Sequence, residues 1–362
     1  MQQYGFIFYL IHVFLKIIFL EMIYRRCLLL IITNKYKGVI NMNKLTKIGL
    51  SALAGSLVAT SAFAGEMSVS GGASMAVEHV NGAAASTGKS FYMGNQLTFT
   101  GGGELENGLN VSLSFVIDQG DDTSNATSTA PFDSHSVTVS SDTFGALTLH
   151  GEGGDSAVGA MDGSAAGGIW DNFQATADEP KSGKSSDDML AYKLPSFVDG
   201  LTVTTSYTPN GIGFGGVDSS VSYAAAYTGI EGLTLKYGVG EDNSTATTAD
   251  VTAWHVSYAW GPITVTATDL EYDHATDTSD RSMSSEAISY TVSDAISLTY
   301  GQEEIEDGAS GSIAAEFTSI SASYTAGGMT ITASQQEAEN HSYSTAITED
   351  NERWALSASF AF

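Results

Sequence analysis

Apolar and polar residues alternate in short segments along most of the chain after residue 65. In residues 233–239, for example, Leu, Leu, Tyr and Val take every second position, with Thr, Lys and Gly between them. Successive side chains of a strand point to opposite faces, so each segment predicts a strand with one apolar and one small or polar face. No helical period interrupts the pattern. The predicted strands are 67–79, 91–100, 109–117, 135–140, 145–151, 188–195, 201–207, 221–227, 233–239, 254–260, 263–268, 286–293, 296–300, 320–324, 329–333 and 354–362.

The connections between these sixteen segments alternate between short and long. Short turns at one rim, longer loops at the other and an even number of strands are typical of an up-and-down barrel in an outer membrane. A closed sheet of this size leaves a lumen too wide for side chains to fill, so the polar strand faces would meet water. We therefore predict an all-β fold, a transmembrane antiparallel barrel. The long connections include 118–134, 152–187, 240–250, 271–284, 301–312 and 335–351.

The last nine residues predict the strand that closes this barrel. Their apolar face would meet lipid, and the aromatic end would lie at the membrane interface. The alternative is a soluble sandwich that buries the segment as an edge strand, because an exposed apolar edge invites aggregation. The ending also resembles the terminal signal of bacterial outer-membrane proteins, which the barrel-assembly machinery reads. The residues that carry this assembly signal are Trp354, Phe360 and Phe362.

The other end of the chain predicts export through the periplasm to the outer membrane. Residues 42–64 are basic at first, then apolar, and end on Ala-Phe-Ala, as a secretory signal peptide does. Cleavage after Ala64 would leave a barrel domain of residues 65–362. The apolar part of residues 1–41 could anchor the chain in a membrane. We favour the interpretation that 1–41 is a non-native upstream extension, because a complete signal peptide begins at Met42.

The charge of the expected mature chain is strongly negative. Seven of the 14 Lys and Arg residues and one of the 41 acids precede residue 65, which leaves seven bases and 40 acids. Phosphate contacts need a basic surface, so nucleic-acid binding is excluded. The single cysteine, Cys27, also precedes residue 65, which excludes disulfides and thiolate metal sites from the mature chain. Such acidity could indicate disorder, but the regular apolar alternation argues against it.

Residues 152–187 form the longest predicted connection, and a loop of this length is either functional or disordered. The loop begins with a Gly-Glu-Gly-Gly-Asp run at 151–155, a turn at 192–201 lies beyond it, and the chain ends on Phe362. In these motifs the chain resembles the general porins of Gram-negative bacteria, most closely the alphaproteobacterial, Rhodobacter-like type. The resemblance implies a homotrimer of sixteen-stranded barrels. It also implies that the third long loop folds into each lumen and narrows the pore.

The resemblance assigns the pore constriction to residues of loop 152–187 and to a facing wall of cations. By strand parity the wall side chains point into the lumen. The family's dense basic cluster is missing, so its strong transverse field is not expected. A pore lined mainly by acids concentrates cations. We therefore predict passive diffusion of small hydrophilic solutes and ions with a preference for cations. The loop residues are Asp155, Asp162, Asp171, Asp178, Glu179, Trp170 and Phe173, and the wall residues are Lys193, Lys236, Arg353 and His150.

Two other functions stay open. A substrate-specific uptake channel would need aromatic residues along the lumen, for which Trp170 and Phe173 are candidates. A surface adhesin or β-solenoid would need a fixed short repeat, and none is visible. No nucleophile, base and orienting group occur in a recognisable order, so we predict no enzyme, no cofactor and no metal site. Acidic clusters at 118–122, 277–280 and 303–307 could bind Ca²⁺ or Mg²⁺ loosely, or could be solvated loops.

Overall fold

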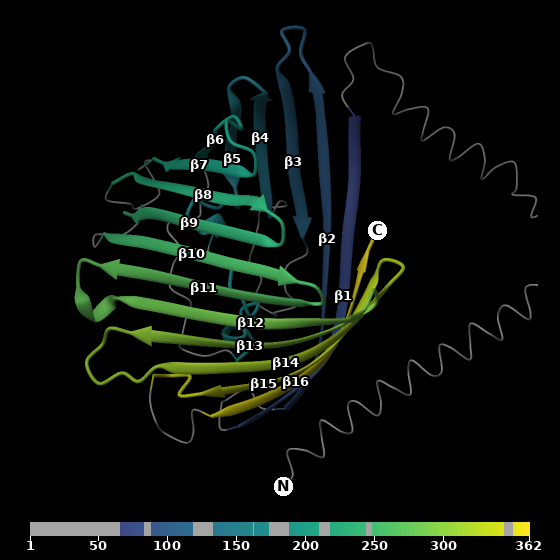
Figure 1. Ribbon diagram of the computed structural model, residues 1–362, viewed down its shortest axis with the longest axis vertical. Coiled ribbons are helices and arrows are strands. Elements are labelled where there is room, and N and C mark those ends of the chain that lie inside the picture. The colour runs from purple at the N-terminus through teal and green to yellow at the C-terminus, as the bar shows by residue number, and fades with distance from the viewer. Residues whose placement is uncertain are drawn as a thin grey trace, which may run out of the picture. The chain divides into compact units, whose positions relative to one another are not determined.

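Sixteen strands of the computed structural model form a closed antiparallel barrel (Figure 1). Each strand pairs with its neighbours in sequence, and β1 pairs with β16 to close the ring. The predicted fold and strand number are confirmed. The predicted signal peptide and upstream extension lie outside the described residues, which are 66–82, 88–118, 133–161, 163–173, 188–209, 218–243, 248–343 and 350–362.

All sixteen predicted segments coincide with strands. The bounds are β1 (Glu66–Gly82), β2 (Gly88–Glu104), β3 (Asn110–Asp118), β4 (Ser134–Ser141), β5 (Gly145–Glu152), β6 (Met189–Lys193), β7 (Leu201–Thr208), β8 (Ser220–Ile230), β9 (Leu233–Asp242), β10 (Ala249–Trp260), β11 (Ile263–His274), β12 (Arg281–Ser293), β13 (Ile296–Asp307), β14 (Ala315–Ala326), β15 (Met329–Glu339) and β16 (Asn351–Ala361).

Several strands continue into segments that the sequence analysis assigned to long loops. Strands β11, β13 and β15 run on to His274, Asp307 and Glu339, so the predicted loop boundaries there are wrong. The alternation of apolar and polar residues marks only the part of a strand whose outer face is apolar. Beyond that part the outer face is polar and the inner face carries apolar residues such as Leu270 and Ile305, yet the ladder of hydrogen bonds between neighbouring strands continues.

The apolar side chains of the strands point out of the barrel. Leu235, Val256, Val265 and Leu298, all predicted to face outward, have exposed fractions between 37 and 51%. Tyr and Trp side chains accompany them, as the aromatic girdles of membrane barrels require. The outward-facing aromatic residues include Tyr207, Tyr237, Trp254, Tyr258, Trp260, Tyr290 and Tyr300.

The closing strand is paired up to the last residue. The backbone N–H of Phe362 donates to the carbonyl of Gly71 at 3.0 Å, and the N–H of Gly71 donates back at 2.8 Å. Phe362 therefore continues the ladder between β16 and β1, and its side chain lies exposed on the outer face. Its role as an assembly signal stays a prediction.

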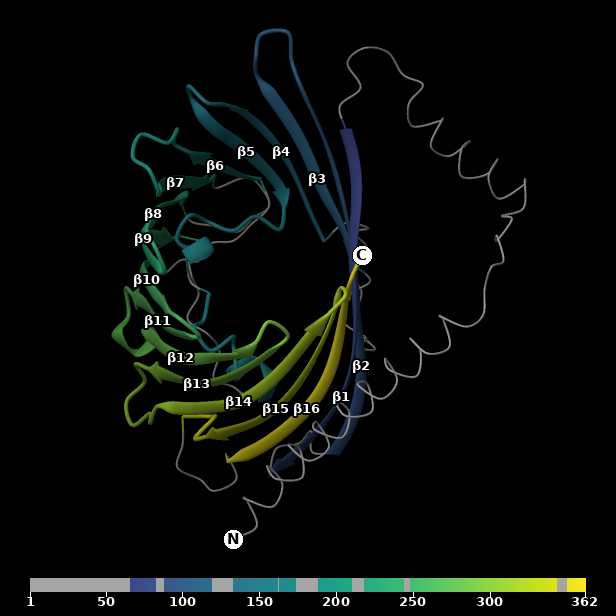
Figure 2. The same ribbon diagram turned by 45° about the vertical axis from the view of Figure 1, so that its right-hand side comes forward.

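The described residues that follow β5, 153–161 and 163–173, lie inside the ring of strands, where Figure 2 shows them in teal. They hold two 3-10 turns, η1 (Gly159–Met161) and η2 (Trp170–Phe173), and a third, η3 (Asp277–Ser279), follows β11. Within the described residues no helix is long and apolar enough to cross a membrane. The main apolar cluster of buried residues is formed where this segment meets the wall.

Candidate functional site: the loop inside the barrel

The inner wall presents one row of side chains that are direct neighbours in the strand register. Thr268 of β11, Ser285 of β12, Glu303 of β13 and Phe317 of β14 lie side by side in this row. All four are fully buried, although the opposite faces of their strands are exposed. A row that faces a water-filled lumen would be wet, so burial means that something covers it. The segment between β5 and β6 does so, and we call it the constriction loop.

The first part of the constriction loop is held by two serines. Ala157 N–H donates to Ser206 Oγ at 2.9 Å, and Val158 N–H donates to Ser222 Oγ at 3.3 Å. Behind Val158 the wall residue is Gly240, where an added Cβ would lie 2.9 Å from a methyl group of Val158. The missing side chain at this position lets the loop backbone lie directly on the strands.

The middle of the loop lies on the buried row. Thr268 Oγ1 donates to the carbonyl of Gly163 at 3.1 Å, and Ala166 N–H donates to Ser285 Oγ at 2.9 Å. The next side chain in the row, Glu303, also accepts hydrogen bonds from the loop. The loop therefore follows the row from strand to strand, and β11, β12 and β13 each contribute one polar side chain to hold it.

The end of the described loop is held by apolar packing. Ile169 and Phe173 are buried together with wall residues from β10 to β15, and the rings of Phe173 and Phe317 are 6.0 Å apart, centre to centre. Burying side chains of this size contributes roughly 1.5–3 kcal/mol each. The loop is thus fixed by hydrogen bonds along its middle and by two anchors at its end. The wall residues of this cluster are Val251, Ala253, Leu270, Met283, Ile305, Ala315, Phe317 and Ala338.

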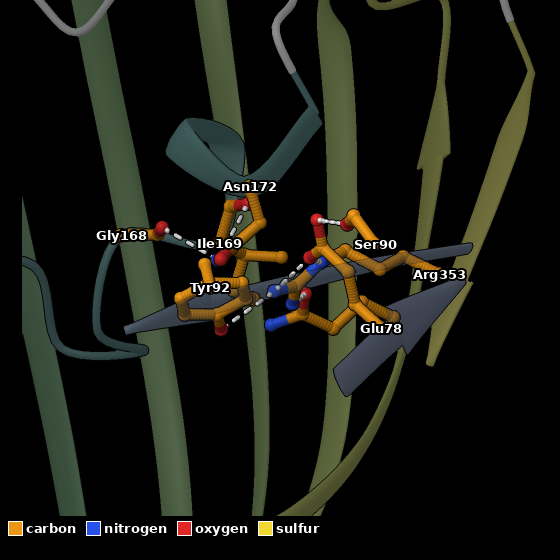
Figure 3. A network of polar contacts seen from close by, with 8 residues as sticks. Glu78, Ser90, Tyr92, Gly168, Ile169, Asn172 and Arg353 are labelled. Carbon is orange, nitrogen blue, oxygen red and sulfur yellow. Dashed lines mark hydrogen bonds and ion pairs between the residues drawn. The ribbon is translucent and has the colours of Figure 1, made fainter. Parts of the chain in front are cut away.

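A second wall, formed by β15, β16, β1 and β2, carries a network centred on Arg353. Its guanidinium lies 2.6 Å from a carboxylate oxygen of Glu78 and donates to Gln336 Oε1 at 2.7 Å. Figure 3 shows the Glu78 carboxylate and the Tyr92 hydroxyl both directed at this group, and Tyr92 accepts from it at 3.4 Å. Ser90 donates to the second carboxylate oxygen of Glu78 at 2.7 Å. Arg353 is only 5% exposed, so its charge is balanced by Glu78 rather than presented to the passage.

The structure brings the predicted loop residues together only in part. Asp155 and Asp171 are exposed on the loop, Trp170 is half-buried against the apolar cluster, and Phe173 is buried in it. Asp162, Asp178 and Glu179 lie outside the described residues. The buried position of Phe173 removes it from the surface that a solute could touch.

The predicted wall residues face the lumen. Lys236 is two positions from Gly238, whose face meets the loop residue Val158. Lys193 shares the inner face of β6 with the buried Met189, and His150 contacts the start of the loop at Gly154. No carboxylate among the described residues forms an ion pair with Lys193 or Lys236. Arg353 shares the inward orientation but is paired with Glu78.

The sequence analysis did not identify two acids, Glu78 and Glu303, as site residues. Glu78 has inward parity in the first strand and Arg353 has it in the last, so closure of the ring could have suggested the pair. In the register of β1 and β16, Glu78 lies opposite Ala355, two positions from Arg353. Only this register brings the side chains of Glu78 and Arg353 together. Glu303 was assigned to a solvated loop because the acidic run 303–307 hides the strand alternation.

The acidic run at 303–307 does not form one cluster. Because it lies on β13, Glu303 points into the lumen and Glu304 points outward. Among the residues that the structure describes, no group of three or more His, Cys, Asp or Glu side chains could hold a metal ion. Loose binding of Ca²⁺ or Mg²⁺ at the acidic loops stays a prediction.

Comparison with known proteins agrees with the barrel fold. The sequence model of the family described as Gram-negative porin matches residues 49–362, so the chain belongs to that family. No curated protein matches the chain. Among solved structures, the anion-selective porin from Comamonas acidovorans is 15% identical, with a TM-score of 0.62 over 82% of this chain and 100% of its own. A triple mutant of the Rhodopseudomonas blastica porin is 14% identical, with a TM-score of 0.59 and the same coverage.

The fold and the family together define the class of protein. The chain is a β-barrel channel of the outer membrane through which solutes and ions pass. Family and fold indicate a channel rather than an enzyme.

Proposed function

We propose that the chain forms a water-filled pore for passive diffusion of small hydrophilic solutes and ions, and that this pore prefers cations. The observation that carries the preference is the pairing of Arg353 with Glu78, which balances one of the few lumen cations. Asp155 and Asp171 are exposed on the loop, and the positive charge of the wall then comes mainly from Lys193 and Lys236.

The remaining described bases add little to that wall. Lys89 pairs across the strands with His79 on the outer face of the barrel. Arg281 is the first residue of β12 and lies in a pocket with Asp280, Asp307 and three further acids. With 40 acids against seven bases after residue 64, the potential along the passage should be negative.

The fold itself does not fix the sign of the selectivity, because the Comamonas acidovorans porin is an anion-selective protein with the same fold. The sign must come from the side chains that line each pore. A negative lining concentrates cations, and the enrichment fades as salt shortens the screening length to about 3 Å at 1 M.

Reversal potentials across a planar bilayer with a KCl gradient test this proposal. We expect a potential of the sign that cation flow gives, largest at low salt. Neutralising the five loop acids together, as Asn or Gln, should reduce it. A zero or anion-selective potential for the unmodified protein, or an unchanged one for the variant, would overturn the cation preference. The five acids are Asp155, Asp162, Asp171, Asp178 and Glu179.

We also infer a homotrimer that associates through the outer face of β1–β5. The large apolar side chains exposed there are aliphatic, Met or Phe, whereas β7–β16 expose Tyr and Trp. Interfacial Tyr and Trp mark a surface that meets lipid headgroups. Their absence from the outer face of the described part of β1–β5 favours a protein neighbour, and Met adapts well to such contacts. We further propose that the barrel-assembly machinery recognises Phe362.

A substrate-specific channel is not proposed. Its sequence support came from Trp170 and Phe173, and both pack against the wall cluster. Tyr92 is an exposed aromatic residue on the inner face, but it is engaged with Arg353.

A further inference from the structure

Glu303 is a carboxylate in an unusual position. Its side chain is 2% exposed, between Ser285 and Phe317 in the buried row of the inner wall. Burying a charge is costly unless hydrogen bonds or an opposite charge compensate for it. No lysine or arginine among the described residues forms an ion pair with Glu303. The compensation must therefore come from hydrogen bonds.

Every described hydrogen bond to the Glu303 carboxylate comes from the constriction loop. Oε1 accepts from Gly168 N–H at 2.9 Å and, in a short contact, from Ser164 Oγ, and Oε2 accepts from Trp170 N–H at 3.1 Å. Hydrogen bonds to an ionised acceptor are roughly twice as strong as neutral ones. The carboxylate thus depends on the docked loop, and the loop depends on the carboxylate.

The backbone of the loop is shaped for this contact. Gly167 and Gly168 have φ values of +89° and +70°, which L side chains rarely adopt. These two left-handed residues turn the chain so that the N–H groups of residues 168 and 170 converge on one carboxylate. Successive amides arranged in this way form an anion-binding concavity. Here the anion is a side chain of the wall.

The other hydrogen bonds between the wall and the loop involve no charged group, and such bonds are weaker than charge-assisted ones. Ser206, Ser222, Thr268 and Ser285 are neutral hydroxyls, and each makes one bond to a loop backbone group. Glu303, by contrast, is charged, and it accepts hydrogen bonds from three donors within seven residues of the loop.

We propose that Glu303 is the positioning residue of the pore, and that its ionised carboxylate holds the middle of the constriction loop against the wall and so sets the width of the passage. This inference rests on the proposed function, because it requires that the loop narrows a conducting pore. Glu303 itself lies beneath the loop and does not contact the permeating solute.

The first experiment compares Glu303→Gln with Glu304→Gln as a matched control. Both variants remove one carboxylate from adjacent positions of β13, but Glu304 is exposed on the outer face. The amide that replaces the Glu303 carboxylate would keep one acceptor oxygen and turn a donor toward a loop N–H, so at least one loop bond would be lost. Single-channel conductance of the full chain in planar bilayers is the measurement.

A measurement at high salt separates a change in the width of the pore from a change in its charge. At about 1 M KCl the screening length is about 3 Å, so the loss of one charge barely changes the ion concentration in the pore. A released loop widens the passage at any salt concentration. We expect Glu303→Gln to raise the mean conductance at 1 M KCl by roughly 1.5-fold or more, with added open-channel noise, and Glu304→Gln to leave it unchanged.

A rescue experiment keeps the inference testable if Glu303→Gln also lowers stability. The chain after residue 64 has no cysteine, and an added Cβ at Gly301 would lie 2.6 Å from the Cβ of Ala166. The Cβ atoms of a disulfide are about 3.8 Å apart, so the bridge can form once the loop moves away from the wall by about 1 Å. In the Glu303→Gln background, cysteines at 166 and 301 should restore the original conductance when oxidised. Reduction should raise the conductance again.

The outcomes are distinguishable from failure of the proposed function. If the unmodified protein forms no channel, the proposed function fails first. If it conducts and Glu303→Gln equals Glu304→Gln at 1 M KCl, Glu303 does not position the loop. A raised conductance that the oxidised disulfide leaves unchanged would also overturn the inference, because the change would then come from the wall and not from the loop.

Discussion

The inside of the barrel has two walls that differ in how their polar residues are used. On β7–β14 the inner face meets the constriction loop and offers it hydroxyls, glycines, apolar side chains and the carboxylate of Glu303. On β15, β16, β1 and β2 an arginine-centred network joins four strands. The strands of both walls have similar alternating patterns. The difference shows that alternation places a residue inside, while its neighbours in the row decide what it does there.

The largest expected effect is at the apolar end of the covered wall. Phe173→Ala should cost the docked state of the constriction loop about 3–5 kcal/mol, because a buried aromatic side chain is lost and a cavity is left. The barrel strands should remain intact. Hydrogen exchange should therefore speed up at the amides of residues 164–170 but not in β11–β14. Unchanged protection of the loop amides would mean that polar contacts alone hold it.

A smaller effect is expected at the other wall. Arg353→Met should cost about 2–3 kcal/mol of barrel stability, because Glu78 is left with a desolvated and unpaired charge. This loss of stability is smaller than for a fully buried ion pair because the Glu78 side chain is 21% exposed. Thermal unfolding in detergent measures the loss. Adding Glu78→Leu to Arg353→Met should recover most of it, and a double variant no more stable than the single one would contradict this account.

The smallest effect concerns the outer face of the barrel. Leu113→Trp on β3 should weaken the trimer by roughly 1–3 kcal/mol, because a larger side chain overpacks a protein interface. Val265→Trp on β11 should be tolerated, because that face meets lipid and carries other aromatic residues. Native mass spectrometry of the detergent-extracted protein gives the trimer fraction. A monomeric unmodified protein, or equal trimer fractions for the two variants, would refute the assignment of β1–β5 to the interface.

The strands could be read from the sequence because their signal is local. The apolar positions of β9 or β13 repeat every second residue, and each segment can be recognised without its partners. The strand ends could not be read in the same way. At residues 269–274 and 301–307 the outward positions become polar or acidic and apolar residues such as Leu270 and Ile305 point inward, so the pattern of apolar residues on the outer face ends while strand pairing continues.

The candidate site was only partly predictable. The family resemblance implied that the long loop folds into the lumen, and parity placed Lys193, Lys236 and Arg353 inside. The identity of the wall residues that meet the loop could not be inferred. Ser164 and Glu303 are 139 positions apart, and their contact depends on the register of every strand between them.

The sequence by itself determined the number of strands, the faces of the alternating segments within them and the negative sign of the charge, because these depend on short-range periodicity and on composition. The tertiary structure decided which charges are balanced and which are left to act on ions. Glu78 and Arg353, 275 positions apart, become neighbours only when the first and last strands close the ring. Electrostatic interactions act through space and fall off with distance, so their partners are set by register and closure rather than by position along the chain.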